Sequence, residues 1–363
     1  MITVVLCSFI AILLTFLESK GKMRRGMLYG FIIVTFLGCI HYNYGNDYEG
    51  YMLWFETYAH QNLSYSNIFD DYNWEPGWVI LNHIFKDVGF FALVAFVNII
   101  LNAIYFLTIR KYVKKILWPF AMSVYLLSTS LYILNFSMMR QGLAVAIFLL
   151  AWTFIRQGRT APSLLLILLG ASFHGSALIL SPFALIGKAK VSNGKPIAIV
   201  MVVLFISLYL SATLAPDIFQ AIKTWDYFFA QDSLDYYEKS KLLERTYGFG
   251  FIVNLVPFIV GISLLLRKNN KPEINYLTTI CLFAFIVAPF GSVLSMLVRF
   301  SYYFVAYQVI GVPKMYSMIS NATIRASATV LFYIMLIYGY VNFFSNPTWI
   351  RAYSEFHTIF EVI

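Results

Sequence analysis

The sequence predicts an all-α, polytopic integral membrane protein, and three observations carry this prediction. Of the 363 residues, 60% are hydrophobic and only 12% are charged, whereas soluble globular chains carry about 25% charged residues. The apolar stretches are long enough to cross a bilayer. The basic residues lie in short clusters between these stretches, and this distribution is typical of the loops of a membrane protein. The net charge of +9 therefore does not indicate a nucleic-acid-binding surface.

The predicted spans follow from the apolar stretches and from the rule that Lys and Arg collect on the cytoplasmic side. The first span, 2–17, precedes the basic cluster 20–25, which places the beginning of the chain outside. This span lacks a basic region in front of it, so we do not expect a cleavable signal. The other predicted spans, which bring the total to about ten crossing helices, are 27–40, 88–109, 117–134, 139–155, 196–214, 247–266, 274–291, 293–312 and 326–344.

One apolar segment, 161–187, has basic residues at both ends, so the rule places both ends inside. The segment must then turn at Ser172–Gly175. Each arm has about 11 residues, or roughly 16 Å of helix, against a hydrocarbon core of roughly 30 Å. We therefore expect a re-entrant or steeply tilted helical hairpin. The alternative is one full span with Lys188 outside, which would invert the topology downstream.

The whole chain, 1–363, is predicted to form a single transmembrane domain with two large outer loops, 41–87 and 215–246. This arrangement places 18 of the 26 Lys and Arg residues inside and 15 of the 17 Asp and Glu residues outside. Within the first loop, 76–87 is predicted to form a short amphipathic helix at the outer interface, with Pro76 in its first turn. The tail 345–363 is expected to lie outside.

The first outer loop combines carboxylates with aromatic rings, and its 41–75 stretch contains no Lys or Arg. Carboxylates hydrogen-bond sugar hydroxyls, and flat rings stack on the C–H face of a pyranose. The loop residues Tyr48, Tyr51 and Trp74, together with Tyr302, are therefore candidates for sugar binding. The alternative is a solvated loop with an aromatic belt at the membrane surface.

Two arginines lie on the predicted outer side, where topology does not require them. Arg140 begins the 139–155 helix, and Arg299 lies within the apolar 293–312 helix. An arginine at the middle of a membrane helix costs about 2.5–3.5 kcal/mol on insertion scales. Each arginine either pairs with a loop acid such as Asp47 or Glu75, or snorkels to the headgroups. Alternatively, the two guanidinium groups hold a phosphate or pyrophosphate, which their planar fork suits.

Two further residues are candidates for proton transfer. His174 lies at the predicted apex of the hairpin, where irregular backbone usually lines a cavity, so it either bonds a phosphate, accepts a proton or has a structural role. Glu75 directly precedes Pro76 and is either a helix-start carboxylate or a general base. The three cysteines are scattered in apolar stretches. No His or Cys has the spacing of metal ligands, so neither a metal site nor a cofactor is predicted.

The sequence resembles the EpsG/Wzy family of O-antigen and exopolysaccharide polymerases. The motifs that carry the resemblance, in chain order, are NYGNDYEGYMLWFE, WEPGWVILNHIF, MMRQGLAVAIFLLA, FHGSALILSPFALI and VRFSYYF, which span 43–304. The resemblance implies a GT-C-like glycosyltransferase of the bacterial inner membrane, with its active site on the periplasmic or outer face. It also implies undecaprenyl-pyrophosphate-linked oligosaccharides as donor and acceptor, metal-independent chemistry and, usually, a chain-length regulator as partner.

Together, these observations give each candidate residue a role. Arg140 and Arg299 would hold the pyrophosphate, and His174 would bond the phosphate or help as a base. Asp47 or Glu75 would deprotonate the acceptor hydroxyl, and direct displacement would invert the anomeric carbon. The alternatives are an O-antigen ligase that uses the same donor, a membrane acyltransferase, and a flippase or transporter for lipid-linked oligosaccharides. The internal repeats typical of transporters are not evident in the sequence.

Overall fold

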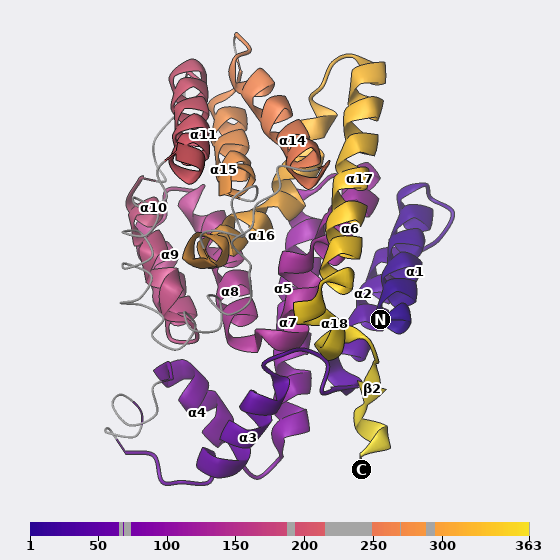
Figure 1. Ribbon diagram of the computed structural model, residues 1–363, viewed down its shortest axis with the longest axis vertical. Coiled ribbons are helices and arrows are strands. Elements are labelled where there is room, and N and C mark those ends of the chain that lie inside the picture. Colours follow the sequence, from indigo (N-terminus) through magenta and orange to yellow (C-terminus); the bar gives the residue numbers. More distant parts are fainter. Residues whose placement is uncertain are drawn as a thin grey trace. The chain divides into compact units, whose positions relative to one another are not determined.

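The computed structural model describes residues 1–64, 68, 74–186, 193–214, 249–268, 270–287 and 295–362, and almost all regular structure in this part is helical (Figure 1). Contacts divide the chain into two compact units. The first comprises 1–189, 306–313 and 336–363, and the second comprises 190–305 and 314–335. The all-α prediction is confirmed, whereas the single domain, the ten crossings and the GT-C-like architecture stay predictions.

Several of the described helices have the apolar surface of membrane spans, and some also have the length. Among the described residues, three helices are long and apolar enough to cross a bilayer: α1 (Ile2–Ser19), α5 (Phe90–Tyr112) and α17 (Ala322–Ser345). Large apolar side chains such as Leu6 and Phe9 on α1 are more than half exposed. Because such surface is unfavourable in water, lipid is the expected surrounding. The shorter apolar helices of the first unit are α2 (Gly26–Ile40), α6 (Trp118–Leu127), α8 (Met139–Ile155) and α9 (Thr160–Ala171).

Helices α1 and α2 pack closely because small residues line their contact. Gly26 and Gly30 lie four residues apart on α2, and a Cβ atom at Gly30 would lie 2.8 Å from the carbonyl oxygen of Ala11. The turn between the helices is tied by Glu18, whose carboxylate accepts a hydrogen bond from the backbone N–H of Met27 at 2.8 Å. This small-xxx-small spacing is a common way for membrane helices to approach each other.

The predicted span 117–134 is not one continuous helix, which corrects the sequence-based expectation. After the single turn η2 (Lys115–Leu117), helix α6 ends at Leu127, and Ser128 adopts an extended conformation. The chain continues as a π-helical turn, η3 (Thr129–Ile133), and a short helix, α7 (Leu134–Ser137), bent by 50° from α6. The Ser128–Ser130 run explains the break, since hydroxyl side chains compete with the backbone for helical hydrogen bonds.

The predicted hairpin is confirmed as a fold element. Helix α9 forms its first arm, and η4 (Gly175–Leu180) and α10 (Ser181–Ile186) form the second, with the turn at Ser172–His174. The second arm packs along α9, and α9 packs on α8. How deeply the hairpin enters a membrane stays a prediction.

Among its described residues, the first outer loop contains two helices where the sequence suggested one. Helix α3 (Tyr48–Tyr58) was not expected, whereas α4 (Pro76–Ile84) begins at the predicted proline and ends three residues earlier than predicted. The expected apolar face of α4 is divided, because Trp78 is buried but Ile80 and Ile84 are exposed. The second predicted outer loop, 215–246, lies outside the described residues.

The tail folds back onto the start of the first outer loop. After α18 (Pro347–Tyr353), the strand β2 (His357–Thr358) pairs antiparallel with β1 (His41–Tyr42), and the turn η6 (Ile359–Glu361) follows. Gly45 donates its backbone N–H to the carbonyl oxygen of Ala352 at 3.1 Å. Tyr353 is buried against Tyr44, with ring centroids 5.0 Å apart. The tail therefore holds the segment that leads into α3.

The second unit contains the remaining apolar helices. They are α11 (Lys195–Leu214), α14 (Phe249–Leu265), α15 (Pro272–Val287) and parts of α16 (Ser295–Ser317) and α17. Helix α15 packs on both α11 and α14. An exposed ion pair of 2.9 Å joins Glu273 at the start of α15 to Lys314 near the end of α16.

The stability of the first unit is predicted to depend on pH through His41. This side chain is fully buried between Tyr48 and Phe136, and burial lowers the pKa of its imidazole to about 4, although its hydrogen bond to the Gly38 carbonyl opposes the shift. Since the pKa in the unfolded chain is about 6.5, the unfolded state binds the proton more readily below that pH. The free energy of unfolding should therefore fall as the pH decreases from about 6.5 to about 4, by about 2 kcal/mol at pH 5.

Thermal unfolding of the purified protein in detergent, measured across this pH range, tests the prediction. The variant His41→Asn should lose this pH-dependent component. If both proteins showed the same pH profile, His41 would not be the titrating group.

Candidate active site

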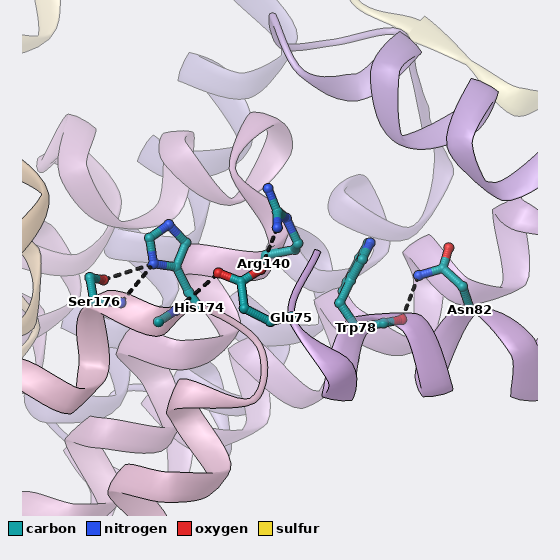
Figure 2. Close-up of polar contacts among 7 residues, drawn as sticks. Glu75, Trp78, Asn82, Arg140, His174 and Ser176 are labelled. Atoms are coloured by element: carbon teal, nitrogen blue, oxygen red, sulfur yellow. Dashed lines mark hydrogen bonds and ion pairs between the residues drawn. The ribbon is translucent and has the colours of Figure 1, made fainter. Parts of the chain in front are cut away.

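A single carboxylate, that of Glu75, joins three segments that lie far apart in the sequence. One oxygen, Oε2, accepts a hydrogen bond from Nη1 of Arg140 in the first turn of α8, which makes an ion pair. The other oxygen, Oε1, accepts a hydrogen bond from the backbone N–H of Gly175 at 3.0 Å. Figure 2 shows Glu75 between Arg140 and the hairpin turn that carries His174. The start of α4, the start of α8 and the hairpin turn therefore meet at this residue.

A second contact fixes the start of α4 on the hairpin turn. Gly77 donates its backbone N–H to the carbonyl oxygen of Ser172 at 2.7 Å. A Cβ atom at Gly77 would lie 2.7 Å from the same oxygen, so the close approach requires glycine. The WEPGW sequence thus supplies a carboxylate that binds the turn, a proline that suits the first helical turn, and a glycine that permits the contact.

An aromatic cluster of Tyr51, Trp54, Trp74 and Trp78 holds the guanidinium group of Arg140. This group lies 4.4 Å from the ring centroid of Trp74 and 5.8 Å from that of Tyr51. Trp74 stacks on Trp54 with centroids 4.7 Å apart and ring planes 9° from parallel. Trp78 lies against Tyr51 at 5.3 Å. Cation–π contacts of this kind stabilise an arginine where water is partly excluded.

Tyr51 remains a neutral phenol within this cluster. Its burial raises the pKa of the phenol, and the neighbouring Arg140, which lowers that pKa, does not cancel the effect. The negative charge of Asp47 also raises the pKa of Tyr51. Tyr51 therefore contributes a hydroxyl group and a ring to the site but not a charge.

His174 is oriented by Ser176, which lies two residues further along, in η4. Its Nδ1 atom lies 2.8 Å from the hydroxyl of Ser176 and 3.4 Å from the backbone N–H of that residue. A backbone N–H can only donate, so Nδ1 is the acceptor and the neutral ring carries its proton on Nε2. This tautomer suits donation of a hydrogen bond to a phosphate better than acceptance of a proton.

Asp47 borders the same site from the start of α3. Its backbone N–H donates a hydrogen bond to the hydroxyl of Ser137 at 3.2 Å, and its side chain is exposed. Of the sequence-predicted residues, the structure thus brings together Asp47, Tyr51, Trp74, Glu75, Arg140 and His174. Among the alternatives considered for Arg140, the structure shows the ion pair with a loop acid, which is Glu75.

Tyr48 does not join this group, and the two remaining predicted residues, Tyr302 and Arg299, belong to the second unit. Tyr48 is fully buried, with its ring packed against His41, Tyr42 and Phe90, so the prediction that a sugar stacks on it does not fit the structure. Tyr302 lies in the part of α16 that belongs to the second unit. Arg299 lies in the same part, and its side chain is outside the described residues, so its part in a phosphate clamp stays a prediction.

Sequence reasoning missed three contributors to the site: Trp54, Trp78 and the Gly175 amide. The spacing of Tyr51, Trp54 and Tyr58 places them on one face of a helix, and this period could have revealed both α3 and the stacking ring of Trp54. No local signal marks the Gly175 amide. Within the described part of the chain, no group of three or more His, Cys, Asp or Glu residues could hold a metal ion.

A family model provides the decisive comparison. The model described as the EpsG family matches residues 26–354, from α2 to the tail. The chain belongs to the EpsG family. The resemblance seen in the sequence motifs is thereby confirmed, and membership indicates a membrane protein of the polysaccharide polymerase type. No curated protein and no solved structure matches the chain.

The close contact at Gly77 leads to a test of the site architecture. The variant Gly77→Ala should destabilise the docking of α4 on the hairpin turn by about 1–3 kcal/mol, because the backbone oxygen of Ser172 cannot move away without a shift of the turn. Thermal unfolding and limited proteolysis between α3 and α4 would measure the effect. The matched control is Gly50→Ala, since Gly50 is helical and a Cβ atom there meets no atom within 4 Å. Equal stability of the two variants would contradict the docking role of Gly77.

Proposed function

We propose that this EpsG family protein is a polysaccharide polymerase that joins oligosaccharide repeat units carried on undecaprenyl pyrophosphate. The reaction takes place at the outer face of the bacterial inner membrane and is metal-independent. The observation that carries the proposal is the family match, together with an arginine held beside a hairpin turn and an acid-rich loop. A guanidinium group in such a position binds a phosphate, and the neighbouring carboxylates and rings suit a sugar.

The proposed reaction is a direct glycosyl transfer. The hydroxyl oxygen of the acceptor unit attacks the anomeric carbon of the donor, and the bond from that carbon to the pyrophosphate oxygen breaks. The hydroxyl proton passes to Asp47 or Glu75, and undecaprenyl pyrophosphate leaves with the bonding electron pair. Attack from the face opposite the leaving group inverts the configuration of the anomeric carbon.

The protein contributes most where negative charge develops. Arg140, and Arg299 if it faces the same side, would stabilise the pyrophosphate as its bond to the sugar lengthens. His174 would donate its Nε2–H to a phosphate oxygen, which accords with the acceptor role of its Nδ1 atom. Of the two candidate bases, Asp47 is exposed and Glu75 is engaged by Arg140.

Polymerisation in a strain that lacks its own polymerase, but supplies the repeat unit, tests the proposal. The wild-type protein should give a ladder of polymer lengths. The variant Arg140→Lys keeps the charge but loses the planar fork, so polymerisation should fall about 10²–10³-fold and the ladder should collapse to single repeat units. The variant Arg299→Gln should behave in the same way. The control is Arg351→Gln, an exposed arginine of α18 that should leave the ladder unchanged.

Other outcomes point to the alternative functions. Equal amounts of each variant in the membrane must first be confirmed by immunoblot. Transfer of single units to a lipid A core, without polymer, would favour the ligase. Movement of the lipid-linked unit without any new glycosidic bond would favour the flippase. A full ladder from Arg140→Lys would remove Arg140 from the proposed mechanism.

A further inference from the structure

The contacts of Glu75 are those expected of a bound anion. Its carboxylate receives a guanidinium N–H from Arg140 and a backbone N–H from Gly175, which are two types of donor that also hold phosphate groups. The side chains of Glu75 and Arg140 are only 23% and 22% exposed, so the pair is largely removed from water. A carboxylate of the protein therefore lies where the proposed function would place a phosphate.

This carboxylate leaves part of the binding capacity unused. One carboxylate oxygen accepts a hydrogen bond from Arg140 and the other from the Gly175 amide. The carboxylate therefore binds only one N–H group of the Arg140 guanidinium, that of Nη1. The Nε–H of Arg140 is buried and has no acceptor among the described residues. A phosphate group, with three oxygens in a tetrahedral arrangement, can accept the Nε–H of Arg140 in addition to the N–H that Glu75 now accepts.

Arg140 does not depend on Glu75 for its position. The ring of Trp74 lies 4.4 Å from the guanidinium group, and Trp54 stacks behind that ring. These contacts remain when the carboxylate moves away. The cation is therefore preorganised for exchange of one anion for another, and a preorganised site loses little binding free energy to ordering.

We propose that the Glu75 carboxylate occupies the position of a ligand phosphate, and that the phosphate end of a lipid pyrophosphate displaces it from Arg140 and the Gly175 amide. This inference rests on the proposed function, since it names the ligand group of the same site. Two anions cannot share these donors at close range, so Glu75 competes with the ligand. Displacement also breaks the contact of Glu75 with the hairpin turn, which couples ligand binding to that turn.

Binding of farnesyl pyrophosphate, a soluble lipid pyrophosphate, to the full chain in nanodiscs tests the inference by calorimetry. The isosteric variant Glu75→Gln removes the competing charge, so it should bind the probe at least about tenfold more tightly than the wild type does. The control Glu49→Gln removes an exposed charge of α3 that is hydrogen-bonded to Asn43 and not to Arg140, and it should change the affinity less than about twofold. In an Arg140→Gln background, Glu75→Gln should bring no gain.

A second measurement uses the wild-type protein, so its result does not depend on the folding of a variant. Carbodiimide labelling of carboxylates, read by mass spectrometry, should modify Glu75 several-fold faster when farnesyl pyrophosphate is present, because the displaced carboxylate has lost its partners. Simple shielding by a ligand would have the opposite effect.

The outcomes separate this inference from the proposed function. If the wild type bound the probe through Arg140 but Glu75→Gln bound it no better, and labelling did not rise, the phosphate site would stand and the displacement of Glu75 would be refuted. If neither the wild type nor Glu75→Gln bound the probe, both the inference and the pyrophosphate role of Arg140 would be refuted.

Discussion

The ion pair between Glu75 and Arg140 is the interaction on which the candidate site depends. It joins α4, α8 and the hairpin turn, and it is stable only because other contacts offset the loss of water around two charges. The Gly175 amide satisfies the second oxygen of the carboxylate, and Trp74 covers the guanidinium group. The aromatic residues of the loop thus act first on the arginine, and any contact with a sugar comes in addition to that role.

The sequence predicted those features whose causes are local. The bounds of α8 and the first residue of α4 agree with the prediction, because hydropathy, a leading proline and flanking charges mark them directly. The hairpin was predicted from basic residues at both of its ends. Glu75, Arg140 and His174 were recognised for a related reason, since a polar or charged group beside apolar stretches needs a partner or a function.

Features that depend on distant partners could not be predicted in this way. Arg140 could have paired with Asp47 or with Glu75, and only the packing of α4 on the hairpin turn decides between them. Tyr48 and Tyr51 look alike in the sequence, yet the first packs in the interior and the second faces the arginine. The pairing of the tail with β1 likewise has no signature in either two-residue strand.

That strand pairing constrains how the chain threads the membrane. Residues joined by strand hydrogen bonds must lie on the same side of the bilayer, so the chain between Tyr42 and His357 crosses it an even number of times. The predicted topology, in which the hairpin 161–187 turns back and adds no crossing, has this parity. If the same segment were one full span, the number would be odd, and β2 would emerge on the side opposite to its partner. With the other eight predicted spans between these strands counted as crossings, the two short strands favour the hairpin over the single span.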